Sequence, residues 1–414
     1  MTLYGQLQER EKSGQLIRVG VIGAGQMGAG MVAQIATIPG MAVVGISDLR
    51  KENARKAADS YNESAKVKED ILISDDFKEV IHSSEVEVIV DATGSTEVGA
   101  KIAFETLLAR KHLVLLNAEV DITIGPLMHQ LFTATNLVYT GSDGDEPAAT
   151  TELFEFAKSM GMEVLVAGKG KNNKLRPEAN PDTVGKEAEE RGMSAHMLAS
   201  FADGTKTMAE MNLLSNAIGF LPDTVGMHGI SADLEGTVKN LRTKEEGGVL
   251  DNYGVVEYVD GIAPGVFVIV KAQNEDVRVE LDYMMKKVDD HHILYRPYHL
   301  ASLETPLTVA KAVLNKDHAI VPLGTPVADT AAVTKKDIKA GEKIDGIGGY
   351  CVRGVIEKHE DLKANGHIPI GLIAGNVTAK RDIPKGTFLT EDDVELDTST
   401  TVWKLRQLQD QMIG

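Results

Sequence analysis

The chain has 414 residues, and its 43 basic and 61 acidic side chains give a formal net charge of −18. Hydrophobic residues make up 43% and charged residues 25%, which is typical of a globular protein and excludes wholesale disorder, and the length predicts two or three domains. The acidic excess argues against nucleic-acid and membrane partners, and the single cysteine excludes a disulfide framework. The sequence has no long apolar run and no signal-peptide pattern, which predicts a cytoplasmic protein.

A glycine-rich segment follows the first expected strand, an apolar and β-branched run at 16–22. Residues 29–36, directly after the glycines, have helical composition. In this strand–turn–helix context the segment predicts a dinucleotide-binding loop, with a glycine turn that binds no ligand as the alternative. The residues concerned are Gly23 for the tight turn, Gly25 for close approach of a pyrophosphate, Gln26 and Met27 at the start of the helix, and Gly28 for helix–strand packing.

Asp48 ends the second expected strand, at 41–47, and lies 20 positions after Gly28. A carboxylate at this place accepts hydrogen bonds from the adenosine ribose, which favours NAD over NADP. Arg50 follows two residues later, and an arginine there can stack on adenine and pair with a 2′-phosphate. The sequence therefore leaves NAD and NADP both open.

Further strands are expected at 85–91, 112–116 and 137–140, in alternation with helices. Open parallel sheets bind ligands at the carboxyl ends of their strands, so Thr93 and Gly94 after the first of these strands are expected at the cofactor. Asn117 and Glu119 follow the second and are expected on the nicotinamide side. This pattern predicts an α/β fold whose first domain, residues 1–150, is a doubly wound Rossmann domain.

An acidic turn, Gly144-Asp145-Glu146-Pro147, follows the last of these strands. Asp145 and Glu146 are candidates to orient a substrate hydroxyl or to bind a divalent ion such as Mg²⁺ or Mn²⁺. The alternative is an ordinary polar turn with solvated carboxylates, because Asp and Gly are common in turns.

A basic segment follows the strand expected at 163–167, and the rest of the chain is strongly acidic. It is interpreted either as a solvated loop or as the wall of a pocket for a substrate phosphate or carboxylate. Its cations are Lys169 and Lys171, taken as catalytic candidates, and Lys174 and Arg176, taken as substrate-binding candidates. The polar residues from 172 to 191 are expected to form an excursion or lid.

An amphipathic helix is expected from Thr205 onward, with Lys206 and Glu210 one turn apart on the same face. The apolar neighbours suggest burial, and a half-buried Lys–Glu pair can act as acid and base, whereas an exposed pair would be a surface ion pair. His299 is open to two interpretations, a core or helix-start histidine and a substrate contact.

Short strands are expected at 253–258, 265–271 and 277–281, which gives residues 151–324 an α+β catalytic and oligomerisation domain. An internal repeat follows. The segment 337–341 (DIKAG) matches the segment 382–386 (DIPKG), in each case after a polar strand edge. Two copies are too few for a solenoid, so a small β-rich domain is expected over residues 325–414.

The glycine-rich fingerprint, Asp48, the segment Asp91-Ala92-Thr93-Gly94 and the turn at 144–147 resemble the homoserine dehydrogenase superfamily. The C-terminal repeat resembles the SAF domain of antifreeze-like, altronate dehydratase and flagellar chaperone proteins. The combination is similar to the deoxyxylulose phosphate reductoisomerase-like family. Relative to homoserine dehydrogenases, Glu119 stands where a lysine is usual, and Lys206 and Glu210 exchange the charges of an Asp–Lys pair. The resemblance therefore implies a different substrate on the same hydride-transfer frame.

The reaction implied by the resemblance is conversion of 1-deoxy-D-xylulose 5-phosphate to 2-C-methyl-D-erythritol 4-phosphate with NADPH, a step of isoprenoid biosynthesis. Lys206 and Glu210 would move protons, and the basic segment would hold the phosphate of this small anionic substrate. The resemblance also implies a homodimer or homotetramer. One alternative is an NAD-dependent dehydrogenase or oxidoisomerase of a branched sugar acid, and another is a non-catalytic NAD(P)-binding regulatory protein.

The position of Asp48 generates a first prediction. If its carboxylate contacts the adenosine ribose, Asp48→Ala should weaken the binding of NAD more than that of NADP, because only NAD lacks a 2′-phosphate that repels the carboxylate. Fluorescence titration of both cofactors with wild type and variant measures the two dissociation constants. Unchanged affinity for both would place Asp48 away from the ribose.

Overall fold

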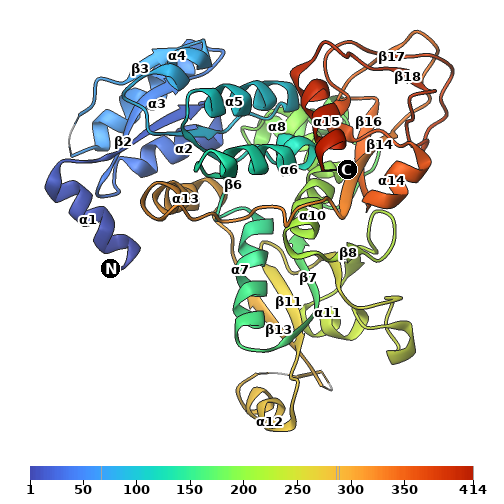
Figure 1. The fold of residues 1–414 in the computed structure, drawn as a ribbon. Coiled ribbons are helices and arrows are strands. Elements are labelled where there is room, and N and C mark those ends of the chain that lie inside the picture. Colours follow the sequence, from blue (N-terminus) through green and yellow to red (C-terminus); the bar gives the residue numbers. More distant parts are fainter. Residues whose placement is uncertain (67, 286, 289, 414) are drawn as a thin grey trace. The chain divides into compact units, whose positions relative to one another are not determined.

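The computed structural model describes residues 1–66, 68–285, 287–288 and 290–413, which form two compact units (Figure 1). The first unit comprises Met1–Asp145, Leu300–Val321 and Lys404–Ile413, and the second comprises Glu146–His299 and Pro322–Trp403. The expected change of domain near residue 150 thus lies close to a boundary between units. Two later segments return to the first unit, which a linear division of the chain at 150 and 324 did not anticipate.

The first unit contains a six-stranded parallel sheet with the order β3-β2-β1-β4-β5-β6. The strands are β1 (Ile17–Ile22), β2 (Met41–Ser47), β3 (Leu72–Ser74), β4 (Val88–Asp91), β5 (His112–Leu115) and β6 (Tyr139–Gly141). The helices are α1 (Leu3–Ser13), α2 (Gln26–Ile35), α3 (Lys51–Ser64), α4 (Phe77–His82), α5 (Thr96–Leu108), α6 (Ala118–Ala134) and α13 (Ala301–Asn315). This strand order is that of a Rossmann domain, which confirms the predicted fold class.

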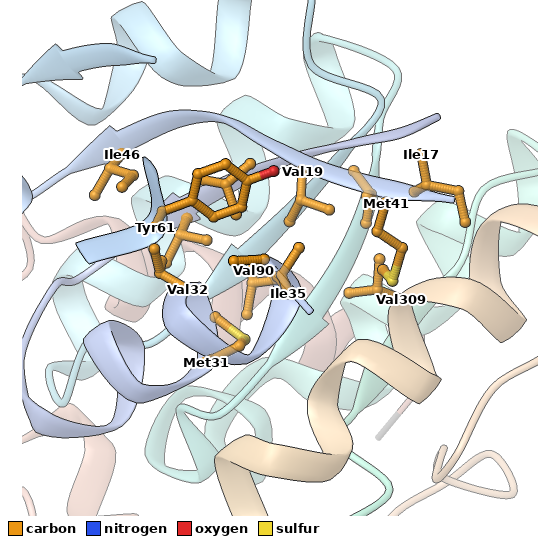
Figure 2. Packing of buried hydrophobic residues seen from close by; sticks show 14 of the residues in the cluster. Ile17, Val19, Met31, Val32, Ile35, Met41, Ile46, Tyr61, Val90 and Val309 are labelled. Carbon is orange, nitrogen blue, oxygen red and sulfur yellow. The ribbon is translucent and has the colours of Figure 1, made fainter. Parts of the chain in front are cut away.

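One apolar core joins this sheet to helices that are far apart in the sequence, as Figure 2 shows. Val19 of β1 and Val90 of β4 pack against Met31 and Ile35 of α2, and Val309 of α13 completes the same cluster. All five side chains are fully buried. The segment after residue 300 is therefore part of the Rossmann core, and its removal would expose apolar surface on α2.

The C-terminal helix, α15 (Thr401–Met412), contributes residues from 404 onward to the same unit. Arg406, only 2% exposed, donates from Nη1 to the Thr123 carbonyl of α6 at 3.3 Å. Gln409 Oε1 accepts from the Leu127 N–H at 3.1 Å, a backbone donor within the same helix. These buried polar contacts fix the end of the chain on α6.

The second unit is built on a seven-stranded mixed sheet with the order β12-β13-β11-β7-β10-β8, and β9 also pairs with β10. The strands are β7 (Glu163–Lys171), β8 (Leu221–Pro222), β9 (Ile230–Ser231), β10 (Val255–Asp260), β11 (Val266–Lys271), β12 (Lys287–Val288) and β13 (His291–Arg296). The helices are α7 (Glu146–Ser159), α8 (Pro181–Glu190), α9 (Ala195–Ala202), α10 (Thr205–Ile218), α11 (Leu234–Asn240), the 3₁₀ turn η1 (Lys244–Glu246) and α12 (Glu275–Met284). The central strand β7 pairs parallel with β10 and antiparallel with β11.

One expectation for this unit is wrong, and a second segment contains a helix that was not expected. Residues 277–281, expected as a strand, lie in the helix α12, because Asn274 caps it by accepting from the Val277 N–H at 2.9 Å and acidic residues fill its first turn. Residues 172–191, expected as a polar excursion or lid, contain the helix α8, which opens with a capping box at Asn180 and buries Val184 against α9. In both segments an asparagine that caps the helix N-terminus favours a helix, and the spacing of apolar residues did not indicate one.

The third predicted module is a set of two short antiparallel sheets within the second unit, β14–β16 and β15–β17–β18. Its elements are β14 (Ala328–Thr334), β15 (Lys343–Ile344), β16 (Val352–Lys358), α14 (His359–Asn365), η2 (Ile370–Leu372), β17 (Val377–Ala379) and β18 (Val394–Glu395). The two repeat copies pair with each other, since Ile338 and Ile383 exchange backbone hydrogen bonds of 2.9 and 2.8 Å. This confirms the predicted small β-rich domain and gives the repeat a structural reason.

Polar side chains of α10 bind this β-rich module directly, as the proximity of α10 to β14 and β16 in Figure 1 suggests. Thr205 Oγ1 accepts from the Gly354 N–H at 2.8 Å, and Asn212 Nδ2 donates to Thr330 Oγ1 at 2.9 Å. Asn216 Oδ1 accepts from the Ala328 N–H at 3.1 Å. The module is therefore an integral part of the second unit.

A buried lysine strengthens this attachment. Lys335 donates to the Asp203 carboxylate at 2.9 Å and to the carbonyls of Ala179 and Gly349 at 2.7 and 2.6 Å. Asp203 is fully buried and also accepts from the Thr205 N–H at 2.9 Å, so one carboxylate fixes both the lysine and the start of α10.

None of the described helices is long and apolar enough to cross a membrane.

Lys335→Met should lower the free energy of unfolding by about 3–5 kcal/mol, because it leaves the Asp203 carboxylate buried without its cation. Urea denaturation of the full chain measures the loss, and Lys336→Met, at an exposed lysine next to it that contacts Glu342, is the control. The double variant Lys335→Met/Asp203→Asn should recover part of the stability. A loss no larger than that of the control would contradict the structural role of this pair.

Candidate functional site

The glycine-rich loop of the first unit leaves space for a ligand. A Cβ on Gly28 would lie 1.9 Å from the Gly23 carbonyl oxygen, whereas a Cβ on Gly25 would meet no described atom within 4 Å. Gly25 caps α2 without any side-chain hydrogen bond, and Gln26 and Met27 in the first turn are exposed. The N–H groups at this helix end can therefore receive a pyrophosphate, as the sequence predicted.

Asp48 at the end of β2 holds this loop in place. Its Oδ2 accepts from the Ala24 N–H at 2.8 Å, and its Oδ1 accepts from the Arg50 N–H at 2.9 Å and from Asn53 Nδ2 at 3.2 Å. The carboxylate thus connects the glycine-rich loop to the start of α3. The contact of Asp48 and Arg50 with the adenosine end of a cofactor stays a prediction, and this geometry adds a positioning function to Asp48.

A buried polar network connects the end of β4 to the residues that follow β4 and β5. Asp91 accepts from the Thr93 N–H and Oγ1 at 2.8 and 2.6 Å and from Asn117 Nδ2 at 3.2 Å, and Asn117 also donates to the Ser95 carbonyl at 3.1 Å. Burial raises the pKa of Asp91 to about 6, and the bonds from Thr93 and Asn117 oppose that rise in pKa. The side chains of Thr93 and Asn117 therefore hold the turn itself.

The remaining predicted cofactor residues lie at the same edge of the sheet. Gly94 is exposed, and Glu119 is buried in the first turn of α6. Their contact with a nicotinamide stays a prediction. The edge where they lie is the one at which Rossmann domains bind a dinucleotide.

The second unit holds a buried cluster of opposite charges around Lys169. Its Nζ donates to Glu146 Oε1 at 2.6 Å and to Glu210 Oε2. Glu146 is the first residue of α7, Glu210 lies in the middle of α10, and all three side chains are 7% exposed or less. His299 Nε2 lies 3.3 Å from the same Glu146 oxygen. The structure therefore brings together four of the predicted site residues.

The charge states in this cluster follow from burial and proximity. Burial favours the neutral form of Lys169, but Glu146 and Glu210 outweigh it, so the pKa of Lys169 is raised and the side chain stays an ammonium. Burial, together with the charge of Glu146, raises the pKa of Glu210, although Lys169 and Lys206 lower it. Glu210 is thus the carboxylate of the cluster with a reason to take up a proton.

Lys171 lies two residues after Lys169 on the same face of β7, because side chains alternate along a strand. Its Nζ donates to the Phe201 carbonyl at 3.0 Å and contacts Thr207 Oγ1 at 3.4 Å. Burial and the neighbouring Lys169 charge lower the pKa of Lys171 to about 8. A lysine of this kind can exchange a proton near neutral pH.

The strand expected at 163–167 is longer in the structure, because β7 continues through Lys171 and buries the first two cations, so these two do not lie in a solvated loop. Lys174 and Arg176 lie beyond the strand and are exposed, and the Arg176 guanidinium contacts Glu187 at 2.9 Å. The alternation of glycine and lysine from Gly168 to Lys171 could have indicated a strand, because Gly168 and Gly170 allow close packing on the face opposite to the lysines. The substrate role of Lys174 and Arg176 stays a prediction.

Asp145 ends the first unit and Glu146 begins the second, so the acidic turn joins the two units along the chain. The ion pair expected between Lys206 and Glu210 has a different form within the second unit, where Glu210 accepts directly from Lys169 and Lys206 acts on Glu210 through its charge. The sequence reasoning missed Asp203 and Thr207, because their contacts with Lys335 and Lys171 depend on the packing of elements far apart in the chain.

Three family models match successive parts of the chain. Residues 17–115 match the N-terminus of dihydrodipicolinate reductase, residues 144–305 match the catalytic domain of oxidoreductase DRL, and residues 329–395 match the SAF domain. No curated protein sequence matches this chain.

Solved structures with a similar fold include a probable dehydrogenase from Thermotoga maritima, with 15% identity, a TM-score of 0.44, and coverage of 74% of this chain and 91% of the other. A putative myo-inositol dehydrogenase from Sinorhizobium meliloti 1021 has 11% identity and a TM-score of 0.40, with 73% and 90% covered. Biliverdin reductase from Synechocystis sp. PCC 6803, solved with biliverdin and NADP⁺, has 14% identity and a TM-score of 0.31, with 63% and 69% covered. These scores do not identify a substrate.

The matched domains identify the chain as an NAD(P)-binding oxidoreductase with a C-terminal SAF domain. The glycine-rich loop and the Rossmann strand order agree with that assignment. Membership of the homoserine dehydrogenase superfamily and of its reductoisomerase-like branch stays a prediction.

The lowered pKa of Lys171 generates a prediction on stability. Folding lowers this pKa from 10.5 to about 8, so between these two pH values the unfolded chain binds more protons and stability rises with pH. The free energy of unfolding of wild type, relative to Lys171→Met, should therefore increase by roughly 1–3 kcal/mol from pH 8 to pH 10.5.

Urea denaturation of the full chain at several pH values measures this difference. Lys174→Met, which removes an exposed lysine of the same segment, is the matched control and should show no such rise. A difference between wild type and Lys171→Met that stays constant with pH would refute the burial of a titrating ammonium.

Proposed function

We propose that this NAD(P)-binding oxidoreductase is a reductoisomerase that converts 1-deoxy-D-xylulose 5-phosphate to 2-C-methyl-D-erythritol 4-phosphate with NADPH. The observation that carries the proposal is the buried cluster of Lys169, Glu146 and Glu210 with Lys171 beside it. A ketol rearrangement needs a proton removed from one hydroxyl and negative charge stabilised on a neighbouring oxygen. This cluster supports both tasks, because it contains a permanent ammonium and two groups with shifted pKa values.

The residues take different parts in this proposal. Lys169 keeps its proton because its pKa is raised, so it stabilises developing charge on a substrate oxygen and does not act as a base. Lys171, with a pKa of about 8, exchanges a proton with the hydroxyl that reacts. Glu210 and Lys206 on α10 support proton movement, and His299 orients Glu146 from 3.3 Å.

The nicotinamide cofactor supplies the hydride that reduces the rearranged aldehyde. Gly25, Gln26 and Met27 would hold its pyrophosphate through backbone N–H groups, and Asp48 would meet its adenosine ribose. The open space at Gly25 fits such a group. Within the second unit, the charged cluster around Lys169 would hold protons and charge for the proposed reaction.

A divalent metal ion is another group that could polarise the carbonyl and hydroxyl oxygens of the substrate. Within the second unit, the carboxylates of Glu146 and Glu210 already hold the ammonium of Lys169. A metal ion at these two carboxylates would meet that positive charge at close range. We therefore derive no step through a metal ion, and addition of Mg²⁺ or Mn²⁺ is a variable of the assay below.

The second candidate is NAD⁺-dependent oxidation, with or without rearrangement, of a branched sugar acid. The observation that favours it is Asp48, whose carboxylate lies at the end of β2 where a 2′-phosphate would be repelled. Lys171 would then act as the base for the hydroxyl being oxidised.

Absorbance at 340 nm tests the proposal directly. With deoxyxylulose 5-phosphate, NADPH should be consumed at more than about 1 s⁻¹, which is the lower end of ordinary enzyme turnover. Assays with EDTA, Mg²⁺ and Mn²⁺ decide the metal requirement. Lys169→Met is the inactive control, because it removes the ammonium from the cluster.

Absence of NADPH consumption would refute the reductoisomerase proposal. Reduction of NAD⁺ with a panel of unphosphorylated sugar acids would then support the second candidate. Tight cofactor binding with no turnover in either assay would instead favour a regulatory protein.

A further inference from the structure

Arg353 is a half-buried arginine on β16 of the SAF domain. Among the described residues, no carboxylate, carbonyl or hydroxyl accepts a hydrogen bond from its guanidinium. An arginine carries five N–H donors and keeps its charge at any physiological pH, so leaving it partly desolvated and without an acceptor costs free energy. Such a side chain is suited to bind an anionic ligand.

The backbone beside Arg353 contacts the helix that carries the catalytic candidates. The N–H of Gly354 donates to Thr205 Oγ1 at 2.8 Å, and Thr205 is the first residue of α10. Lys206 follows at once, and Thr207 Oγ1 lies 3.4 Å from Lys171 Nζ. The first turn of α10 therefore contacts both β16, through Thr205, and Lys171 of β7, through Thr207.

Arg353 lies on the face of β16 opposite to the one that Gly354 turns toward Thr205, and this face packs against the loop after β8. Val355, two residues on and on the same face, has its Cγ1 3.3 Å from the place of a Cβ on Gly226, in the loop after β8. A few residues later, Gly229 packs against the Tyr258 hydroxyl of β10. Tyr258 is the register partner of Lys169 on β7, so both side chains point to one face of the sheet.

The groups that act on the pKa of Arg353 agree with a position of its side chain near Tyr258. Burial lowers the pKa of Arg353, and Asp203, Tyr258 and Glu178 act on that pKa in the opposite direction. Asp203 also acts on the pKa of Lys171. Arg353 therefore lies within electrostatic range of Asp203 and of Tyr258, the register partner of Lys169.

The other cations in this part of the unit are already matched. Lys169 contacts Glu146 and Glu210, and Lys335 contacts Asp203 at 2.9 Å. Arg176 contacts Glu187 at 2.9 Å. Lys171 Nζ is bound by the Phe201 carbonyl and Thr207 Oγ1, and Lys174 is exposed, so Arg353 is distinguished as a half-buried cation without an acceptor among the described residues.

We infer that Arg353 of the SAF domain binds the oxyanion group of the substrate and is a specificity-determining residue. The inference rests on the proposed function for the identity of the reaction, but anion binding can be measured without it. The oxyanion is the phosphate ester of a sugar phosphate or the carboxylate of a sugar acid. The SAF domain thereby supplies part of the substrate site.

Binding of simple anions to the full chain tests the inference independently of turnover. The melting temperature of wild type is measured with increasing inorganic phosphate and, in a second series, with increasing D-erythronate. The anion that matches the substrate should raise the melting temperature of wild type. The same titration of Arg353→Met should give no saturable rise, and Arg353→Lys should give a weaker one because it keeps the charge without the bidentate fork.

Lys343→Met is the matched control, since Lys343 is an exposed cation of the same domain that contacts Asn376 at 3.2 Å. It should respond to anions as wild type does. Arg176→Met tests the rival position and should also keep the response.

Steady-state kinetics give the second readout. With whichever substrate is turned over, Arg353→Met should raise KM by about 10- to 100-fold, the range for loss of a charge-assisted contact, while kcat changes by less than about threefold. A purely structural role would lower kcat and the melting temperature together. Arg353→Lys keeps the test possible if Arg353→Met does not fold.

Two results would overturn the inference. One is an unchanged anion response and KM in both Arg353 variants. The other is failure of both anions to stabilise wild type. Loss of the response in Arg176→Met with retention in Arg353→Met would assign the anion to the exposed segment instead. Inactivity toward deoxyxylulose 5-phosphate together with anion binding through Arg353 would refute only the proposed function.

Discussion

The ammonium of Lys169, buried between the carboxylates of Glu146 and Glu210, is the interaction on which the catalytic part of this protein depends. A buried charge is stable only when it is matched, so three elements must place their side chains together: the central strand β7 and the helices α7 and α10. Any arrangement of the second unit that separated these elements would leave a charge unpaired. The cluster therefore constrains the packing and at the same time provides shifted pKa values for proton transfer.

The SAF domain contributes to this arrangement through α10. Thr205, Asn212 and Asn216 bind the β-rich module, while Glu210 on the same helix reaches Lys169. The buried pair of Lys335 and Asp203 fixes the beginning of the helix. The position of Glu210 is thus determined by contacts on two sides, and the SAF domain has a structural reason to accompany the oxidoreductase fold.

The two units differ in the groups that they offer to a charged ligand. In the first, backbone N–H groups at an open helix end and glycine residues without side chains prepare a place for phosphate groups, and Asp48 and Asp91 stabilise the loops from within. In the second, paired charges are buried, and Arg353 is the half-buried cation that we propose to bind an anionic ligand. Cofactor binding therefore relies on backbone geometry, and the proposed substrate chemistry relies on side-chain charge.

The sequence by itself determined the Rossmann fold, the glycine-rich loop and the β-rich repeat, because these depend on local periodicity and on residues close together in the chain. It also singled out Lys169, Glu146, Glu210 and His299, although it paired Glu210 with Lys206. Only the tertiary structure decided that Glu210 contacts Lys169, that β7 buries Lys171, that α13 belongs to the first core and that Arg353 lacks an acceptor among the described residues. Those facts depend on strands and helices far apart in sequence, and burial and charge pairing between them leave no local signal.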